Sequence, residues 1–92
     1  MPVIASLPYY LNQGCFPGGT TRNWASYGNK MGPVTKEQQY ILADPQTSGG
    51  LLVAVEEAAA GGFEKRMAED GYRLQAIGRL KAKDGGPLIT VE

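Results

Sequence analysis

The feature that most constrains the fold is a continuous apolar run, Leu51-Leu52-Val53-Ala54-Val55, which directly follows Gly49 and Gly50. A short apolar run bounded by turn residues is typical of a strand that is buried on both faces. We therefore predict a central strand over residues 49–55.

Helix start and stop signals predict two helices before this strand. The first covers residues 6–14, with Pro8 in its first turn and a glycine at its end. The second covers residues 35–42, where Thr35 and Gln38 have the spacing of a capping box. An Asp-Pro pair then stops the second helix.

A third helix is predicted over residues 56–70, immediately after the strand. Acidic residues occupy its first turn, Phe63 and Met67 lie one helical repeat apart, and Gly71 stands at the stop position. This segment has the most complete helix signals in the chain.

Residues 74–80 and 88–91 read as two further strands, joined by a turn at residues 84–87. Residues 14–32 hold five glycines and no sustained period, so we predict a long ordered loop there, with one helical turn around Trp24. The order strand, helix, strand, strand predicts an α/β (α+β) layer.

Size and charge narrow the classes of function. The chain has 92 residues, the length of one small domain, and its nine basic and nine acidic side chains cancel. A neutral balance gives no field that would attract nucleic acid or an anionic membrane surface, so neither partner is expected. The single Cys15 excludes an internal disulfide, and no apolar run approaches the roughly 20 residues of a membrane span. We expect a reducing, cytoplasmic setting.

The chain contains no histidine, which removes the commonest general base and metal ligand. With one cysteine and no close carboxylate pair outside residues 56–70, we expect neither a metal site nor a catalytic triad. Any chemistry would depend on backbone amides, hydroxyls, Arg, Lys and single carboxylates.

The first motif that carries chemistry is a double glycine followed by polar side chains: Pro17, Gly18, Gly19, Thr20, Thr21, Arg22 and Asn23. Adjacent glycines let backbone amides converge on an anion, and Arg22 can bind a phosphate or carboxylate with two hydrogen bonds. We therefore take Gly18, Gly19, Thr20, Arg22 and Asn23 as candidates that face a substrate or anion. A tight turn whose Arg and Asn secure a loop is the alternative.

The second motif runs directly into the predicted strand and consists of Asp44, Pro45, Gln46, Thr47, Ser48, Gly49 and Gly50. Phosphate-binding loops normally precede a helix, whose dipole favours an anion, whereas this loop precedes a strand. We therefore favour a structural role for Asp44, Gln46, Thr47, Ser48, Gly49 and Gly50 over a ligand-binding role.

Together, the PGGT-x-RN segment and the DPQTSGG segment resemble the two C-terminal signatures of selenophosphate synthetases. The approach through Cys15, the continuation at residues 25–28 and the strand at residues 76–78 are also similar to that family. The resemblance implies the C-terminal domain of the aminoimidazole ribonucleotide synthetase-like fold, a mixed sheet covered by helices. The short apolar start at Val3 and Ile4 looks like the end of a strand, which indicates an N-terminally truncated domain.

The same resemblance implies a parent enzyme that makes selenophosphate, AMP and orthophosphate from ATP, water and reduced selenium. In that family an N-terminal domain supplies a reactive Cys or selenocysteine, a Lys and the Asp residues that hold magnesium and ATP. None of those motifs is present here, so the chain alone should be inactive and should contain no catalytic residue, metal or cofactor of its own. Cys15 is expected to be a partly buried packing residue.

The expected partners are the N-terminal domain of the parent protein and a second copy, because a truncated sheet would expose apolar surface. Two alternatives remain: a purely structural or dimerisation domain, and a domain of a related purine- or thiamine-pathway phosphotransferase. If the two motifs form one surface, they should be ordered, lie at the same end of the sheet and hydrogen-bond to each other.

Overall fold

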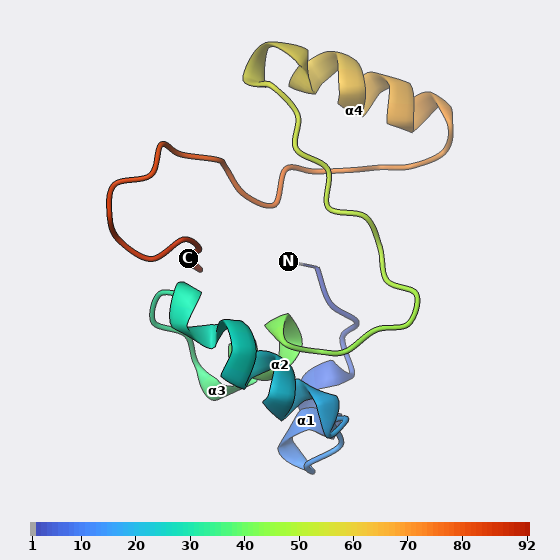
Figure 1. Cartoon of the computed structure of the whole chain (residues 1–92). Helices are drawn as coiled ribbons and strands as arrows, with labels where there is room; N and C mark the ends of the chain where they lie inside the picture. The colour runs from blue at the N-terminus through green and yellow to red at the C-terminus, as the bar shows by residue number, and fades with distance from the viewer. Residues whose placement is uncertain (1) are drawn as a thin grey trace. The chain divides into compact units, whose positions relative to one another are not determined.

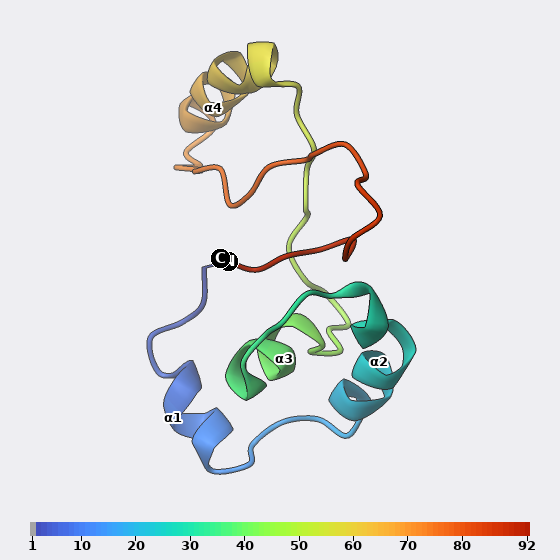
Figure 2. The same ribbon diagram turned by 90° about the vertical axis from the view of Figure 1, so that its left-hand side faces the viewer.

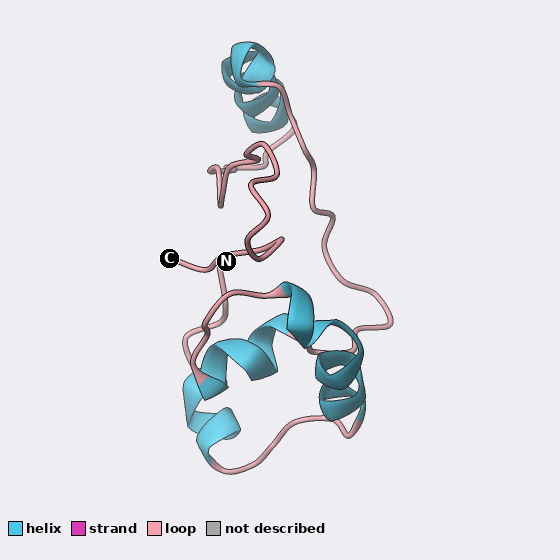
Figure 3. Cartoon of the chain, turned by 60° about the vertical axis from the view of Figure 1, so that its left-hand side comes forward, coloured by secondary structure: helices cyan, strands magenta, loops and turns pink. Residues whose placement is uncertain are grey.

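The structure, a computed structural model, describes residues 2–92. It consists of two units, one formed by residues 3–49 with 83–92 and the other by Pro2 with residues 50–82. Within residues 2–92 all regular elements are helical, and no strand is present (Figure 3). The elements are α1 (Leu7–Asn12), α2 (Gly19–Tyr27), η1 (Gly28–Lys30), α3 (Lys36–Leu42), η2 (Glu57–Ala59) and α4 (Ala60–Glu69).

Helices α1, α2 and α3 form one cluster in the first unit (Figures 1 and 2). The predicted helix at residues 6–14 is confirmed as α1, which ends before Gly14 with its φ of +74°. The segment after α1 is attached to α3 by the rings of Phe16 and Tyr40, which stack with centroids 4.2 Å apart. Such stacked pairs contribute about 1 kcal/mol beyond the area that they bury.

Helix α3 begins with the predicted capping box. The Gln38 backbone N–H donates to the Thr35 hydroxyl (3.2 Å), and the Thr35 backbone N–H donates to Gln38 Oε1 (2.8 Å). Each bond satisfies a backbone donor that the first helical turn leaves without a partner. Helix α3 ends at Leu42, two residues before the Asp-Pro pair that was predicted to stop it.

The helical turn predicted around Trp24 is confirmed, because Trp24 lies in α2. The prediction that the rest of residues 14–32 is a loop is wrong, because α2 alone extends over nine residues. Its inner face consists of Thr20, Asn23 and Trp24, which are buried or half-buried, whereas Arg22 on the outer face is exposed. The spacing of these inner residues is helical, but two of them are polar. The sequence of α2 therefore lacks the apolar residues at helical spacing by which an amphipathic helix is predicted.

The C-terminal segment returns to the first unit but does not form the strand predicted at residues 88–91. Leu88 N–H donates to Lys30 O (2.8 Å), and Gly32 N–H donates to Ile89 O (2.7 Å). These bonds surround a single parallel bridge between Met31 and Ile89. The correction has a simple reason: a strand needs a continuous ladder with a neighbour, and only one residue pair is in register here.

The turn predicted at residues 84–87 is present. Gly86 N–H donates to Asp84 Oδ1 (2.9 Å), and Gly85 has a φ of +85°, a conformation that favours glycine.

The second unit is centred on α4, which confirms most of the helix predicted at residues 56–70. The helix is followed by Gly71 with a φ of +89°, and Tyr72 N–H donates to Met67 O (2.8 Å). This is the pattern of a glycine-terminated helix end.

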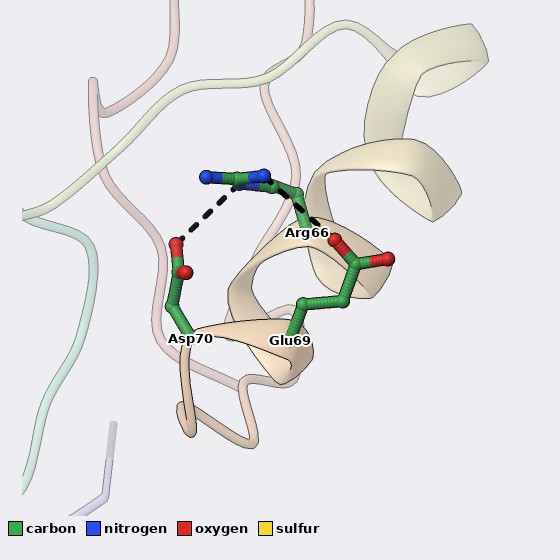
Figure 4. Close-up of polar contacts among 3 residues, drawn as sticks. All are labelled: Arg66, Glu69 and Asp70. Atoms are coloured by element: carbon green, nitrogen blue, oxygen red, sulfur yellow. Dashed lines mark ion pairs between the residues drawn. The ribbon is translucent and has the colours of Figure 1, made fainter.

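Arg66, in the last turn of α4, pairs with two carboxylates on its own helix (Figure 4). Its Nη1 lies 3.8 Å from Glu69 and its Nε 3.5 Å from Asp70. Because all three side chains are exposed, each pair contributes at most a few tenths of a kcal/mol.

The strands predicted at residues 49–55 and 74–80 are extended segments without a ladder in the structure, so the predicted α/β layer is not found within residues 2–92. An extended segment becomes a strand only when its backbone groups bond to a neighbour. Leu51 and Leu80 are 93% and 86% exposed, so these segments also lack apolar cover.

The described chain has little core. Its side chains below a tenth exposed are Thr20 and Ala43. The chain of 9.8 kDa exposes 8057 Å², whereas two separate compact units of this total mass would expose about 6,200 Å². The units are therefore stabilised largely by local helix ends and by a few contacts between helices.

Replacing Thr35 with Ala should destabilise the first unit by about 1 kcal/mol, because the Gln38 N–H loses its acceptor. Thr35→Ser keeps the hydroxyl and is the matched control. Urea unfolding followed by circular dichroism measures both variants, and equal stability of the two would contradict the capping role.

Candidate functional site

The two motifs lie side by side in the first unit. A Cβ atom on Gly19, at the start of α2, would lie 2.9 Å from Pro45 Cγ. Pro45 therefore packs directly against the first turn of α2. Gly50, the last residue of the second motif, is the first residue of the other unit.

One hydrogen bond joins the first motif to the end of α3. Asn23 Nδ2 donates to the carbonyl oxygen of Ala43 (3.0 Å), the residue that follows α3 and precedes Asp44. Asn23 is half-buried and Ala43 is buried. The bond satisfies a carbonyl that the helix end leaves unpaired, so Asn23 fixes the position of α2 relative to the second motif.

The other residues of the first motif differ in exposure. Gly18 and Arg22 are exposed, and a Cβ atom on Gly18 would meet nothing within 4 Å. Thr20 is 1% exposed, and its Oγ1 has no hydrogen-bond partner among the described residues. Of the anion-facing candidates, Gly18 and Arg22 are therefore accessible from solvent, whereas the Thr20 hydroxyl lies inside.

The second motif forms an exposed turn with its own internal contacts. Gln46 Nε2 donates to Asp44 Oδ2 (3.0 Å), and a Cβ atom on Gly49 would collide with Gln46 Oε1. Thr47, Ser48 and Gly50 are exposed. Asn23 bonds to Ala43, the residue before the second motif, and Asp44 bonds within its own loop. The predicted hydrogen bond between the two motifs is therefore not found among the described residues, and the motifs meet through the contact of Pro45 with Gly19 instead.

An open pocket of about 400 Å³ lies beside α2 in the first unit, and it was not predicted from the sequence. Its lining is mostly apolar and includes Lys30, whose Nζ lies 5.3 Å from the centre of the Tyr27 ring. The lining residues are Asn23, Trp24, Tyr27, Gly28, Lys30, Met31, Leu42, Ala43 and Ile89. Only the spacing of Trp24 and Gly28, four residues apart on one helix face, could have indicated it.

Within residues 2–92 no three His, Cys, Asp or Glu side chains gather closely enough to hold a metal ion. Cys15 is exposed, so the expected partial burial of this thiol is wrong. It follows Gly14, which ends the α1 region with a positive φ. Among the same residues, no helix has the length and apolar character needed to cross a membrane.

No protein-family model matches the chain, and no solved structure matches it. Curated proteins named selenide, water dikinase do match. The chain is 44% identical over 91 residues to that of Aeromonas hydrophila, a match that covers 99% of the chain and 26% of that protein. It is 51% identical over 80 residues to that of Pseudomonas aeruginosa, and 52% identical over 73 residues to that of Colwellia psychrerythraea.

The match to the Pseudomonas aeruginosa protein covers 87% of the chain and 23% of that protein. The match to the Colwellia psychrerythraea protein covers 79% of the chain and 21% of that protein. The chain thus spans about a quarter of the length of the curated relatives that it matches. The resemblance inferred from the two motifs is confirmed, and by sequence the chain belongs with the selenide, water dikinases.

Proposed function

We propose that this chain is the C-terminal portion of a selenide, water dikinase, a cytoplasmic enzyme that makes selenophosphate, AMP and orthophosphate from ATP, water and selenide. The observation that carries the proposal is the identity of 44% over nearly the whole chain to a protein of that name. The packing of Pro45 against Gly19 supports it, because it joins the two motifs on which the resemblance rests.

The chemistry of this chain supports a division of labour within the enzyme. Transfer of a phosphoryl group needs metal-neutralised charge and a positioned nucleophile. The resemblance implies that the Asp residues holding magnesium and ATP belong to an N-terminal domain, and the motifs that carry them do not occur in this sequence. We therefore assign magnesium and most of the ATP contacts to the rest of the protein, and regard this portion as inactive alone.

The contribution of this portion is an anion-facing surface at the start of α2. Arg22 is exposed there, and its guanidinium Nη2 lies 4.0 Å from the position of a Cβ atom on Gly19. A guanidinium binds phosphate oxygens with two parallel hydrogen bonds. Gly18, which is open to solvent, would allow a ligand to approach the backbone closely. Thr20 and Asn23 would support this surface from inside.

Two other functions are weaker. A purely structural or dimerisation role would not require an exposed arginine beside the paired motifs, although it would use the exposed apolar segments. A purine- or thiamine-pathway phosphotransferase is not favoured, because the relatives reported above are all named selenide, water dikinase.

In the complete enzyme we propose that the extended segments become strands of a mixed sheet covered by helices. Leu51 and Leu52 are 93% and 84% exposed, although an apolar run of this kind is typical of a buried strand. Pairing with strands from the rest of the protein would cover them. In its absence a second copy of the chain would be the alternative partner.

Hydrogen exchange tests this pairing. We expect the backbone amides of residues 51–55 to exchange at least tenfold more slowly in a complete enzyme than in the 92-residue chain, because ladder bonds protect amides until they open. The α4 amides serve as the internal control. Equal exchange of residues 51–55 in both proteins would contradict the proposed sheet.

Activity can be tested with a chimera in which these 92 residues replace the matching segment of the Aeromonas hydrophila protein. We expect the chimera to consume ATP in a selenide-dependent reaction, and the 92-residue chain alone to show no turnover above background. Turnover by the isolated chain would refute the division of labour, and a folded but inactive chimera would count against the proposed function.

In the same chimera, Arg22→Ala should lower kcat/KM about a hundredfold, the effect expected when one charged donor to a reacting anion is lost. The melting temperature should not change, because Arg22 is exposed. Arg22→Lys keeps the charge without the planar fork and should give an intermediate value. Wild-type turnover in Arg22→Ala would exclude the arginine from the site.

A further inference from the structure

Gly18 and Gly19 are neighbours in the first motif, but their surroundings differ. A Cβ atom on Gly18 would meet nothing within 4 Å. On Gly19 the same atom would lie 2.9 Å from Pro45 Cγ and 3.2 Å from Pro45 Cβ. Carbon atoms in contact are separated by about 3.5–4.0 Å. Position 19 therefore has no room for a side chain, whereas position 18 has.

Backbone conformation does not explain the glycine at position 19. Gly19 is the first residue of α2, and it is not among the glycines with positive φ. Alanine adopts a helical backbone conformation without strain. The contact with Pro45 is the feature of the structure that requires glycine here.

We propose that Gly19 is a positioning residue, whose missing side chain lets Pro45 lie against α2 and so holds the second motif beside Arg22. The long Arg22 side chain could turn away from a methyl group on residue 19. The Pro45 ring could not, because it is closed and fixes its own φ. A methyl group at position 19 would therefore push Pro45 and the start of α2 apart.

The displacement would reach the hydrogen bond between the helices. Asn23 lies one helical turn after Gly19, and its acceptor, the Ala43 carbonyl, lies two residues before Pro45. The proline contact and the hydrogen bond therefore belong to one interface. Moving Pro45 away from α2 would lengthen the bond and expose the Asn23 amide to water.

The test compares Gly19→Ala with Gly18→Ala in the 92-residue chain. The measurements are the urea unfolding midpoint and the exchange rate of the Asn23 side-chain amide protons. Gly19→Ala should raise the equilibrium fraction of molecules in which this interface is open about tenfold, as expected when one methyl group is added to a filled space. Gly18→Ala should stay within about twofold of the original chain, because its methyl group meets no atom.

The decisive measurement is rescue. In a Pro45→Ala background, Gly19→Ala should lower the free energy of unfolding by less than half as much as it does in the chain with Pro45. The double-mutant cycle then shows a coupling between the two positions. The proposal would be overturned if Gly19→Ala lowered stability equally in both backgrounds, if it abolished folding in both, or if it had no effect.

A final measurement rests on the proposed function: in the chimera, Gly19→Ala should lower kcat/KM, and Pro45→Ala should partly restore it. The folding measurements need no turnover, so they separate the two proposals. Coupling between positions 19 and 45 in an inactive chimera would support this inference and count against the proposed function alone.

Discussion

The hydrogen bond from Asn23 Nδ2 to the Ala43 carbonyl is the interaction on which the arrangement of the first unit depends. It joins α2 to the end of α3, and the two most buried side chains among residues 2–92, Thr20 and Ala43, belong to these same segments. A unit with so small a core cannot position its helices by apolar burial alone. A directional bond at a helix end, where a carbonyl has no helical partner, supplies the missing specificity.

Elements whose signals lie within one or two helical turns could be predicted from the sequence. The capping box of Thr35 and Gln38 determines the start of α3, and Gly71 marks the end of α4. These signals depend on backbone groups of the helix itself, so neither the small core nor the division into units changes them. The two motifs were expected to meet at one end of a sheet through mutual hydrogen bonds, but the described chain brings them together through the contact of Pro45 with Gly19.

Features that depend on distant partners could not be predicted. The apolar run from Leu51 to Val55 reads as a buried strand, but the described chain offers it no neighbouring ladder. Only one turn of helix α2 was predicted, for a different reason: Thr20 and Asn23 give its inner face a polar composition. Thr20 is buried, so its hydroxyl does not reach the candidate surface, whereas Arg22 is exposed there. The residue types alone do not show this difference.

The bonds from Leu88 and Gly32 join segments that are far apart along the chain, with residues 50–82 between them forming a separate unit. During translation, residues 3–49 leave the ribosome before residues 83–92 exist, so the first unit is completed late. Closing so long a connection costs conformational entropy that grows only slowly with its length. The order of folding is therefore expected to differ from the order of synthesis: α4 can form from local contacts while the older part of the chain still awaits its final segment.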